Sequence, residues 1–354
     1  MIKVALDARR LQERPLTGTG RRLAHLLPHL AERVEVVLVT DKRRPSPELG
    51  DYEEVRLPVP GKLPEPFWLQ GSVAWWLRGF KGVFHGTQNA VPIAYRGRSV
   101  VTIYDLTWEH HHEGMTPARR LSVLLQARAS ARRSEAVVTI SEFVRQDIIR
   151  TYLLPPDRVV VAPPSVDPIF SPGRVDDLRP ILKRLHVDRP YVVALGGTRR
   201  RGLEVAVEAW RRLTPRAGNP MLVVVGSEAP PDAPGIVHAG QLDDQEWSAL
   251  LAGATAFCYP TRYEGFGMPA LEAAASGVPV VCARVASLPE VLGPAAEWCA
   301  TPTVEDITQG LERLLLNADK RQALQKAGLA RAAEAPTWEQ AAKVEVAAYE
   351  FASR

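Results

Sequence analysis

Short apolar runs alternate with amphipathic stretches along the first half of the chain, which predicts alternating strands and helices. The helical pattern covers residues 22–31, 117–133 and 141–152, and Ser141 suits the N-cap of the last helix. Apolar runs of strand length occupy residues 2–6, 34–40, 82–85, 99–104, 136–140 and 158–162. Such continuous apolar runs are typical of strands buried on both faces, so this half predicts a parallel α/β sheet.

The same alternation restarts after residues 163–189, where proline, serine, aspartate and arginine predict a linker. Strands are expected at residues 191–195, 221–225, 254–259 and 279–282. Helices are expected at residues 203–213, 243–251, 269–276, 304–316 and 318–334. Pro336 then interrupts the pattern. A last helix begins near residue 338 and carries one apolar stripe, made of Trp338, Ala341, Ala342, Val346 and Tyr349.

These patterns predict an α/β fold of two doubly wound, Rossmann-like domains that face a cleft. The first domain is expected at residues 1–167 and the second at residues 168–335. Residues 336–354 are expected to form a C-terminal helix that packs back on the first domain. Open parallel sheets bind ligands beyond the carboxyl ends of their strands, so the cleft is the default active site.

The composition fits two globular domains and excludes other classes. Of 354 residues, 46% are hydrophobic and 24% charged, which at roughly 100–200 residues per domain excludes disordered and fibrous chains. No apolar run approaches the roughly 18 residues of a membrane span. The opening MIKVALDARR lacks the long apolar region of a signal peptide, which predicts a cytoplasmic protein. Three widely spaced cysteines, Cys258, Cys282 and Cys299, indicate buried thiols rather than a disulfide frame or zinc site.

Positive charge is concentrated in the first half of the chain. The net charge is +4, and residues 1–180 are basic while the remainder is slightly acidic. A basic half favours an anionic partner such as phosphate, phospholipid or nucleic acid. The same half holds an aromatic-rich stretch at residues 67–80 and several arginines within residues 119–133. Core packing explains these aromatic side chains, and peripheral contact with a membrane surface is the alternative.

The segment Thr261-Arg-Tyr-Glu-Gly-Phe-Gly-Met-Pro-Ala-Leu-Glu272 carries the strongest functional pattern. Its glycines allow close approach of a ligand, and the helix start at Pro269 offers free amides to an anion. Glu264 is expected at the cleft lip, where it can hold a sugar or face a developing positive charge. Glu272 is expected in the first helical turn, where it can accept ribose hydroxyls. The alternative is a loop charge at Glu264 and a charge at Glu272 that complements the helix dipole.

A second cluster, Leu195-Gly-Gly-Thr-Arg-Arg-Arg-Gly-Leu203, joins a strand end to a helix start. Arg200 and Arg201 can clamp a pyrophosphate, with the glycine amides beneath it. A solvated run of arginines is the alternative. Near the N-terminus, Thr17-Gly-Thr-Gly-Arg21 precedes a helix and is either a phosphate-binding loop or a plain turn.

The segment from Thr261 to Glu272 resembles the signature of the retaining glycosyltransferases of family 4, which have the GT-B fold. The resemblance continues in Gly277-Val-Pro-Val-Val281 and Ser287-Leu-Pro-Glu-Val291, and upstream in His238-Ala-Gly-Gln-Leu242 and Phe257-Cys-Tyr-Pro260. It covers nearly the full chain and extends to mannosyl and rhamnosyl transferases of polysaccharide biosynthesis. It implies transfer of a sugar from a nucleotide diphosphate donor, GDP-mannose or similar, with retained anomeric configuration and without a metal or other cofactor.

The resemblance also implies a set of site residues. Glu264 and Asp105 would be catalytic. The donor contacts would be Gly18, Gly20, Gly197, Arg200, Arg201, Leu242, Gly265, Phe266, Gly267, Met268, Leu271 and Glu272. Relatives usually carry Arg-Lys-Asn in the arginine cluster, where this chain has Arg201 for the lysine and Gly202 for the asparagine. They commonly carry His-Asp-Leu where this chain has Tyr104-Asp-Leu106.

The expected partners are a nucleotide-sugar donor and a glycan or glycolipid acceptor, with no nucleic acid. The resemblance implies that the first domain, residues 1–167, binds the acceptor and that the second, residues 168–335, binds the nucleotide sugar. The expected location is the cytoplasm, with peripheral attachment to the inner face of the membrane as an addition. His85 either faces the cleft or is a loop histidine, and the run His110-His-His112 lacks the partners of a metal site. Two other functions remain open: a sugar-nucleotide epimerase, and a non-catalytic nucleotide-sugar-binding subunit, which the departure at Tyr104 favours.

Overall fold

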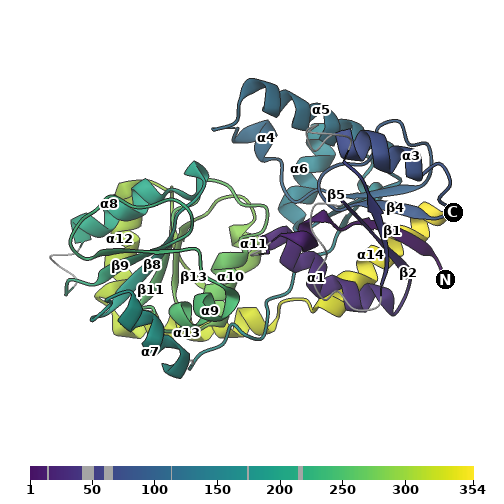
Figure 1. Cartoon of the computed structure of the whole chain (residues 1–354). Helices are drawn as coiled ribbons and strands as arrows, with labels where there is room; N and C mark the ends of the chain where they lie inside the picture. Colours follow the sequence, from purple (N-terminus) through teal and green to yellow (C-terminus); the bar gives the residue numbers. More distant parts are fainter. Residues whose placement is uncertain (14–15, 42–51, 60–66, 113, 174, 214–217) are drawn as a thin grey trace. The chain divides into compact units, whose positions relative to one another are not determined.

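A computed structural model describes residues 1–13, 16–41, 52–59, 67–112, 114–173, 175–213 and 218–354. The chain divides into two compact units, which we call the first and second unit. The first unit comprises residues 1–165 together with 336–354, and the second comprises residues 166–335. Each is a parallel sheet covered by helices (Figure 1). The predicted α/β fold of two Rossmann-like domains is confirmed, and the boundary lies two residues before the expected one.

The first unit contains a seven-stranded parallel sheet. Its strands are β1 (Lys3–Asp7), β2 (Glu35–Asp41), β3 (Glu53–Leu57), β4 (Val83–Gly86), β5 (Ser99–Thr102), β6 (Ala136–Thr139) and β7 (Val159–Val161). They lie in the order β3-β2-β1-β4-β5-β6-β7. The prediction missed β3, because this edge strand is polar and half exposed and gives no apolar run.

The long helices of this unit follow the predicted pattern, and several short ones were not predicted. They are the 3-10 helices η1 (Arg9–Gln12) and η3 (Pro156–Arg158), the π-helix η2 (Trp68–Val73), and the α-helices α1 (Gly18–Ala31), α3 (Ala74–Trp76), α4 (Thr107–His110), α5 (Pro117–Arg133), α6 (Glu142–Tyr152) and α14 (Trp338–Ser353). The N-cap at Ser141 is confirmed, since its hydroxyl accepts a hydrogen bond from the Val144 amide at 3.2 Å.

The prediction of a glycine loop before α1 was wrong. Helix α1 begins four residues earlier than expected, so Gly18 and Gly20 lie in its first turn. The pattern hid this turn because it contains no apolar residue. Gly20 is required by packing, since a Cβ there would lie 2.7 Å from the carbonyl oxygen of Arg10.

Helix α14 packs back on the first unit, as expected (Figure 1). Tyr349 is fully buried, and Ala341 and Ala342 lie in the same apolar cluster as residues of α1. Trp338 at the helix start stacks on His25 with the ring centroids 5.1 Å apart. The apolar stripe read from the sequence is therefore the face that α14 buries.

A buried polar network joins α14 to α1 and the sheet. Arg22 pairs with Glu345 at 2.8 Å, and the hydroxyl of Tyr349 donates to Glu345 at 3.1 Å. His85 on β4 contacts the Tyr349 hydroxyl through Nδ1 at 2.7 Å and the Thr102 hydroxyl through Nε2 at 2.8 Å. Since Tyr349 donates to Glu345, His85 must carry its proton on Nδ1. His85 is thus a buried strand residue that bonds α14, rather than a loop histidine.

The second unit contains a six-stranded parallel sheet. Its strands are β8 (Tyr191–Leu195), β9 (Met221–Val225), β10 (Ile236–Gly240), β11 (Ala256–Tyr259), β12 (Val280–Ala283) and β13 (Ala296–Cys299). They lie in the order β10-β9-β8-β11-β12-β13. The prediction missed the two edge strands: β10 is only partly buried, and β13 carries Glu297 in a strand of four residues.

The helices of the second unit correct one prediction. They are α7 (Val175–Arg184), the 3-10 helix η4 (Arg199–Arg201), α8 (Leu203–Leu213), α9 (Asp244–Ala252), α10 (Met268–Ala275), α11 (Leu288–Leu292), α12 (Val304–Leu315) and α13 (Ala318–Ala333). Residues 163–189 are not only a linker, because they contain α7, whose Leu178 and Ile181 join the core. Pro180 inside this helix obscured its pattern. The three cysteines are buried free thiols, as expected.

Each sheet reverses its strand order next to its first strand. In the first unit the reversal falls between β1 and β4, and in the second between β8 and β11. Loops that leave the carboxyl ends of such neighbouring strands diverge and open a crevice where α/β proteins bind ligands. The two reversals therefore mark where functional residues should be sought in each unit.

His85 gives the first unit a testable pH dependence. Burial lowers the pKa of His85 to about 4, whereas an unfolded histidine titrates near 6.5. Between these values the unfolded state binds more protons, so the free energy of unfolding should fall by roughly 3 kcal/mol as the pH drops from about 6.5 to 4. Urea unfolding at pH 7 and pH 4.5 measures this loss.

The matched variants are His85→Gln and His112→Gln, since His112 is exposed. The unfolding transition of the first unit is the one that His85→Gln should shift. In that transition, His85→Gln should abolish the loss of unfolding free energy between pH 7 and pH 4.5, and His112→Gln should keep it. An equal pH dependence in the wild type and His85→Gln would contradict the role assigned to the buried imidazole.

Candidate active site

Two loops of the second unit meet at the reversal of its sheet. Residues 196–202 follow β8 and residues 260–267 follow β11, and these two strands pair in parallel. Gly202 lets the loops touch: its φ is 67°, and a Cβ there would lie 2.5 Å from the carbonyl oxygen of Pro260. Gly267 has a φ of 95°, with Leu288 where a Cβ would reach, and it ends the second loop at the start of α10.

Arg200 and Glu264 form an ion pair across these two loops. The Nη1 of Arg200 lies 3.0 Å from Oε1 of Glu264, and the two side chains are 20% and 11% exposed. Arg200 Nη1 also donates to the carbonyl oxygen of Tyr263 at 2.6 Å, and its own carbonyl accepts from the amide of Arg262 at 2.8 Å. The guanidinium and the carboxylate that the sequence singled out are therefore held together at the switch point.

Two residues to which the sequence assigned no role fix Glu264. The hydroxyl of Tyr259, the last residue of β11, donates to Glu264 Oε1 at 2.6 Å. Burial raises the pKa of Tyr259 well above its usual value, so the hydroxyl keeps its proton and remains a donor. Ser287 Oγ donates to the carbonyl oxygen of Glu264 at 2.8 Å. Both contacts to the carboxylate fall on Oε1, and within the described residues the structure gives none for Oε2.

Glu272 lies elsewhere on α10 than expected. The helix starts at Met268, so Glu272 is its fifth residue and the prediction of a first-turn position was wrong. Its side chain is buried, and its Oε2 accepts a hydrogen bond from the indole Nε1 of Trp247 at 2.8 Å. Trp247 belongs to α9, and no spacing in the sequence connects the two residues. A buried, oriented carboxylate is the result.

Arg201 contributes a buried donor. Its Nη1 lies 3.4 Å from the carbonyl oxygen of Gly196, and its Nε is buried without a hydrogen-bond partner in the described part of the chain. Buried donors without acceptors are rare, and an anionic ligand would supply one. The amide of Gly197 is already engaged, because it donates to Glu228 Oε2 at 3.1 Å. The sequence analysis did not identify Glu228.

The remaining predicted donor contacts of this unit differ in accessibility. Phe266 is 8% and Leu271 2% exposed. Leu242 packs partly buried against the core, Gly265 lies in the second loop, and Met268 is the first residue of α10. Their contact with a donor stays a prediction.

Asp105, Gly18 and Gly20 belong to the first unit. Asp105 follows β5, and its Oδ1 accepts from the backbone amide of Thr107 at 2.9 Å and from the Thr107 hydroxyl. This turn leads into α4. A Cβ at Gly18 would meet nothing within 4 Å, so this glycine leaves open space at the start of α1. The catalytic role of Asp105 and the cleft between the units stay predictions.

His110, the first histidine of the run, makes a structural contact. His110 Nε2 lies 3.0 Å from both carboxylate oxygens of Asp147 on α6. Among the residues that the structure describes, no group of three or more histidine, cysteine, aspartate or glutamate side chains is arranged to hold a metal ion. Over the same residues, no helix combines the length and apolar character required to cross a bilayer.

Comparisons with known proteins show the family of this chain. A model of "Glycosyltransferase Family 4" matches residues 16–170, and a model of "Glycosyl transferases group 1" matches residues 183–331. O-antigen chain mannosyltransferase B of Escherichia coli is 28% identical over 95% of this chain and 97% of its own length. MMP alpha-(1->4)-mannosyltransferase of Mycolicibacterium hassiacum is 34% identical over 63% of this chain, and the match spans about half of that relative (55%).

Solved structures show the same fold. WaaG, a glycosyltransferase involved in lipopolysaccharide biosynthesis, matches with a TM-score of 0.73 and 17% identity over 98% of both chains. Sucrose-phosphate synthase from Thermosynechococcus elongatus matches with a TM-score of 0.76 and 17% identity over 99% of this chain and 98% of its own. Together, the two family models cover most of the chain and follow its two units. The chain therefore belongs to the glycosyltransferases of family 4, with two Rossmann-like units of the GT-B type.

Proposed function

We propose that this chain transfers a mannosyl residue from a nucleotide diphosphate donor, GDP-mannose or a similar compound, to a glycan or glycolipid acceptor. The anomeric configuration is retained, and no metal ion takes part. The observation that carries the proposal is the Arg200–Glu264 pair at the β8/β11 switch point. The printed activities of the mannosyltransferase relatives support the choice of sugar.

The two arginines account for the donor diphosphate. A departing diphosphate needs positive charge that is already in place before the bond breaks. Arg201 offers its buried Nε, and Arg200 offers a guanidinium whose charge now faces Glu264. A bound diphosphate competes with Glu264 for Arg200. Donor binding therefore frees the Glu264 carboxylate from its ion pair. A guanidinium group can donate two parallel hydrogen bonds to the oxygens of one phosphate. Arg200 and Arg201 can therefore supply the positive charge that a metal ion supplies in metal-dependent enzymes.

Glu264 then faces the sugar. Glycosyl transfer passes through an oxocarbenium-like state, and a carboxylate nearby stabilises its positive charge. Tyr259 and Ser287 hold Glu264 in place through its Oε1 and its carbonyl oxygen. These contacts orient the carboxylate and leave Oε2 for the sugar. Glu272 accepts ribose hydroxyls, with Trp247 fixing its orientation through Oε2.

Replacing the carboxylate of Glu264 tests its role. Glu264→Gln keeps the size of the side chain but removes the charge, so kcat should fall by at least about 100-fold. Glu204→Gln is the matched control, because Glu204 pairs with Arg262 on the exposed surface of the same unit. Circular dichroism verifies the fold of both variants. A Glu264→Gln enzyme with the wild-type kcat would remove the catalytic assignment.

Glu272 should affect donor affinity instead. Glu272→Gln weakens the acceptor of the ribose hydrogen bonds, so the donor KM should rise about tenfold with little change in kcat. Trp247→Phe, which removes the indole donor, should raise the donor KM by less. The exposed Glu290→Gln serves as control. An unchanged donor KM in Glu272→Gln would reject the ribose role.

Chelation and product analysis test the rest of the proposal. Activity should survive excess EDTA, because Arg200 and Arg201 neutralise the leaving group. The product should show the anomeric configuration of the donor by NMR. Full loss of activity on chelation would contradict the metal-independent mechanism, and conversion of the donor without any acceptor would favour an epimerase.

A further inference from the structure

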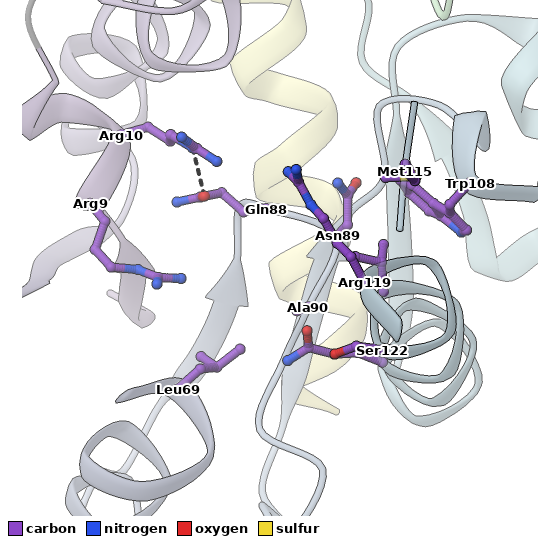
Figure 2. A pocket seen from close by; sticks show the side chains of 12 residues that line it. Arg9, Arg10, Leu69, Gln88, Asn89, Ala90, Trp108, Met115, Arg119 and Ser122 are labelled. Atoms are coloured by element: carbon purple, nitrogen blue, oxygen red, sulfur yellow. Dashed lines mark hydrogen bonds between the residues drawn. The ribbon is translucent and has the colours of Figure 1, made fainter. Parts of the chain in front are cut away.

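A cavity of about 570 Å³ lies in the first unit, beyond the carboxyl ends of β1 and β4. Arg9 and Arg10 follow β1, Gln88 and Asn89 follow β4, and α5 contributes Arg119 (Figure 2). The strand order of this sheet reverses between β1 and β4, so the cavity occupies the ligand position of the fold. Its volume is that of a small-molecule site.

The cavity is positively charged. Within the described part of the chain, three arginines line it and no carboxylate does. Arg9 is neutralised by Asp7 at 2.7 Å, and Arg10 by Glu13. The side chain of Arg119 is exposed and makes neither an ion pair nor a hydrogen bond with any described residue. The net charge therefore rests on Arg119, which points across the cavity toward Arg10 and Gln88 (Figure 2).

Gln88 supplies an independent indication of a ligand. Arg10 Nε donates to Gln88 Oε1 at 2.7 Å, which fixes the amide so that its nitrogen is the free end. That nitrogen, Nε2, is buried and has no hydrogen-bond partner among the described residues. A buried amide donor without an acceptor is unfavourable, and an anionic oxygen placed there would satisfy it.

The rest of the lining suits a sugar rather than an apolar chain. Ser122 and Gln126 from α5 can bond hydroxyls, and the partly buried side chains of Met115 and Val123 provide apolar surface for a ring. A polar wall beside a small apolar surface suits a sugar, whereas a lipid tail would require a continuous apolar lining.

We propose that the cavity binds a sugar or polyol that carries a phosphate group, with the phosphate between Arg10, Gln88 and Arg119. The proposal rests on the proposed function where it makes this molecule the acceptor of the transfer. Binding of the phosphate itself does not depend on that function. The phosphate gains two guanidinium groups and the Nε2 donor of Gln88, while the hydroxyl groups bond Ser122 and Gln126.

Direct binding to the full chain is measured by titration calorimetry with mannose 6-phosphate, with mannose, and with phosphatidylglycerol vesicles as a source of lipid phosphate. Mannose 6-phosphate should bind at least tenfold more tightly than mannose. Arg119→Gln should reduce this ratio to below about threefold, and the exposed Arg132→Gln on the same helix should leave it unchanged. Equal affinity for the two sugars, or binding of the vesicles alone, would overturn the proposal.

Kinetics separate the two proposals. If transfer is observed, Arg119→Gln should raise the KM of a phosphorylated acceptor at least fivefold and leave the donor KM unchanged. A change confined to the donor KM would assign the cavity to the donor and overturn the inference. A third outcome is that no acceptor receives mannose, although the chain binds mannose 6-phosphate more tightly than mannose and Arg119→Gln removes that difference. In that case the proposed function is wrong and the phosphate-binding site is supported.

Discussion

The Arg200–Glu264 ion pair is the interaction on which the account of the second unit depends. It joins the loop after β8 to the loop after β11, and it lies where the strand order reverses. Removing both charges from water is unfavourable, so a largely buried pair of this kind is weak evidence for stability. Its place at the ligand position of the sheet fits the proposed function, in which Arg200 binds the diphosphate and Glu264 faces the sugar.

Neighbouring residues fix the positions of both partners of this ion pair. Tyr259 reaches Glu264 from the end of a strand, and the backbone carbonyl of Tyr263 accepts from Arg200. Glycine at position 202 permits the close contact of the two loops. The loop geometry is thus set by the sheet beneath it and by a few close backbone contacts, and the side chains follow from that geometry.

The sequence was sufficient for the fold and for the main charged residues, and insufficient for their partners. Continuous apolar runs predicted the central strands, whereas β3, β10 and β13 were missed because edge strands are half exposed or polar and lose that pattern. Pro180 concealed α7, and Gly18 and Gly20 concealed the first turn of α1. The pattern 261–272 identified both glutamates. The roles of Trp247, Tyr259 and Glu228 could not be predicted, because each acts through a contact that depends on the folded sheet rather than on spacing.

A double-mutant cycle on Arg200→Gln and Glu264→Gln, followed as kcat/KM for transfer, tests the central claim most directly. If the two residues act as one unit on one donor, the double variant should be about as slow as the slower single variant, since each substitution already breaks the unit. Losses that multiply independently in the double variant would contradict the account.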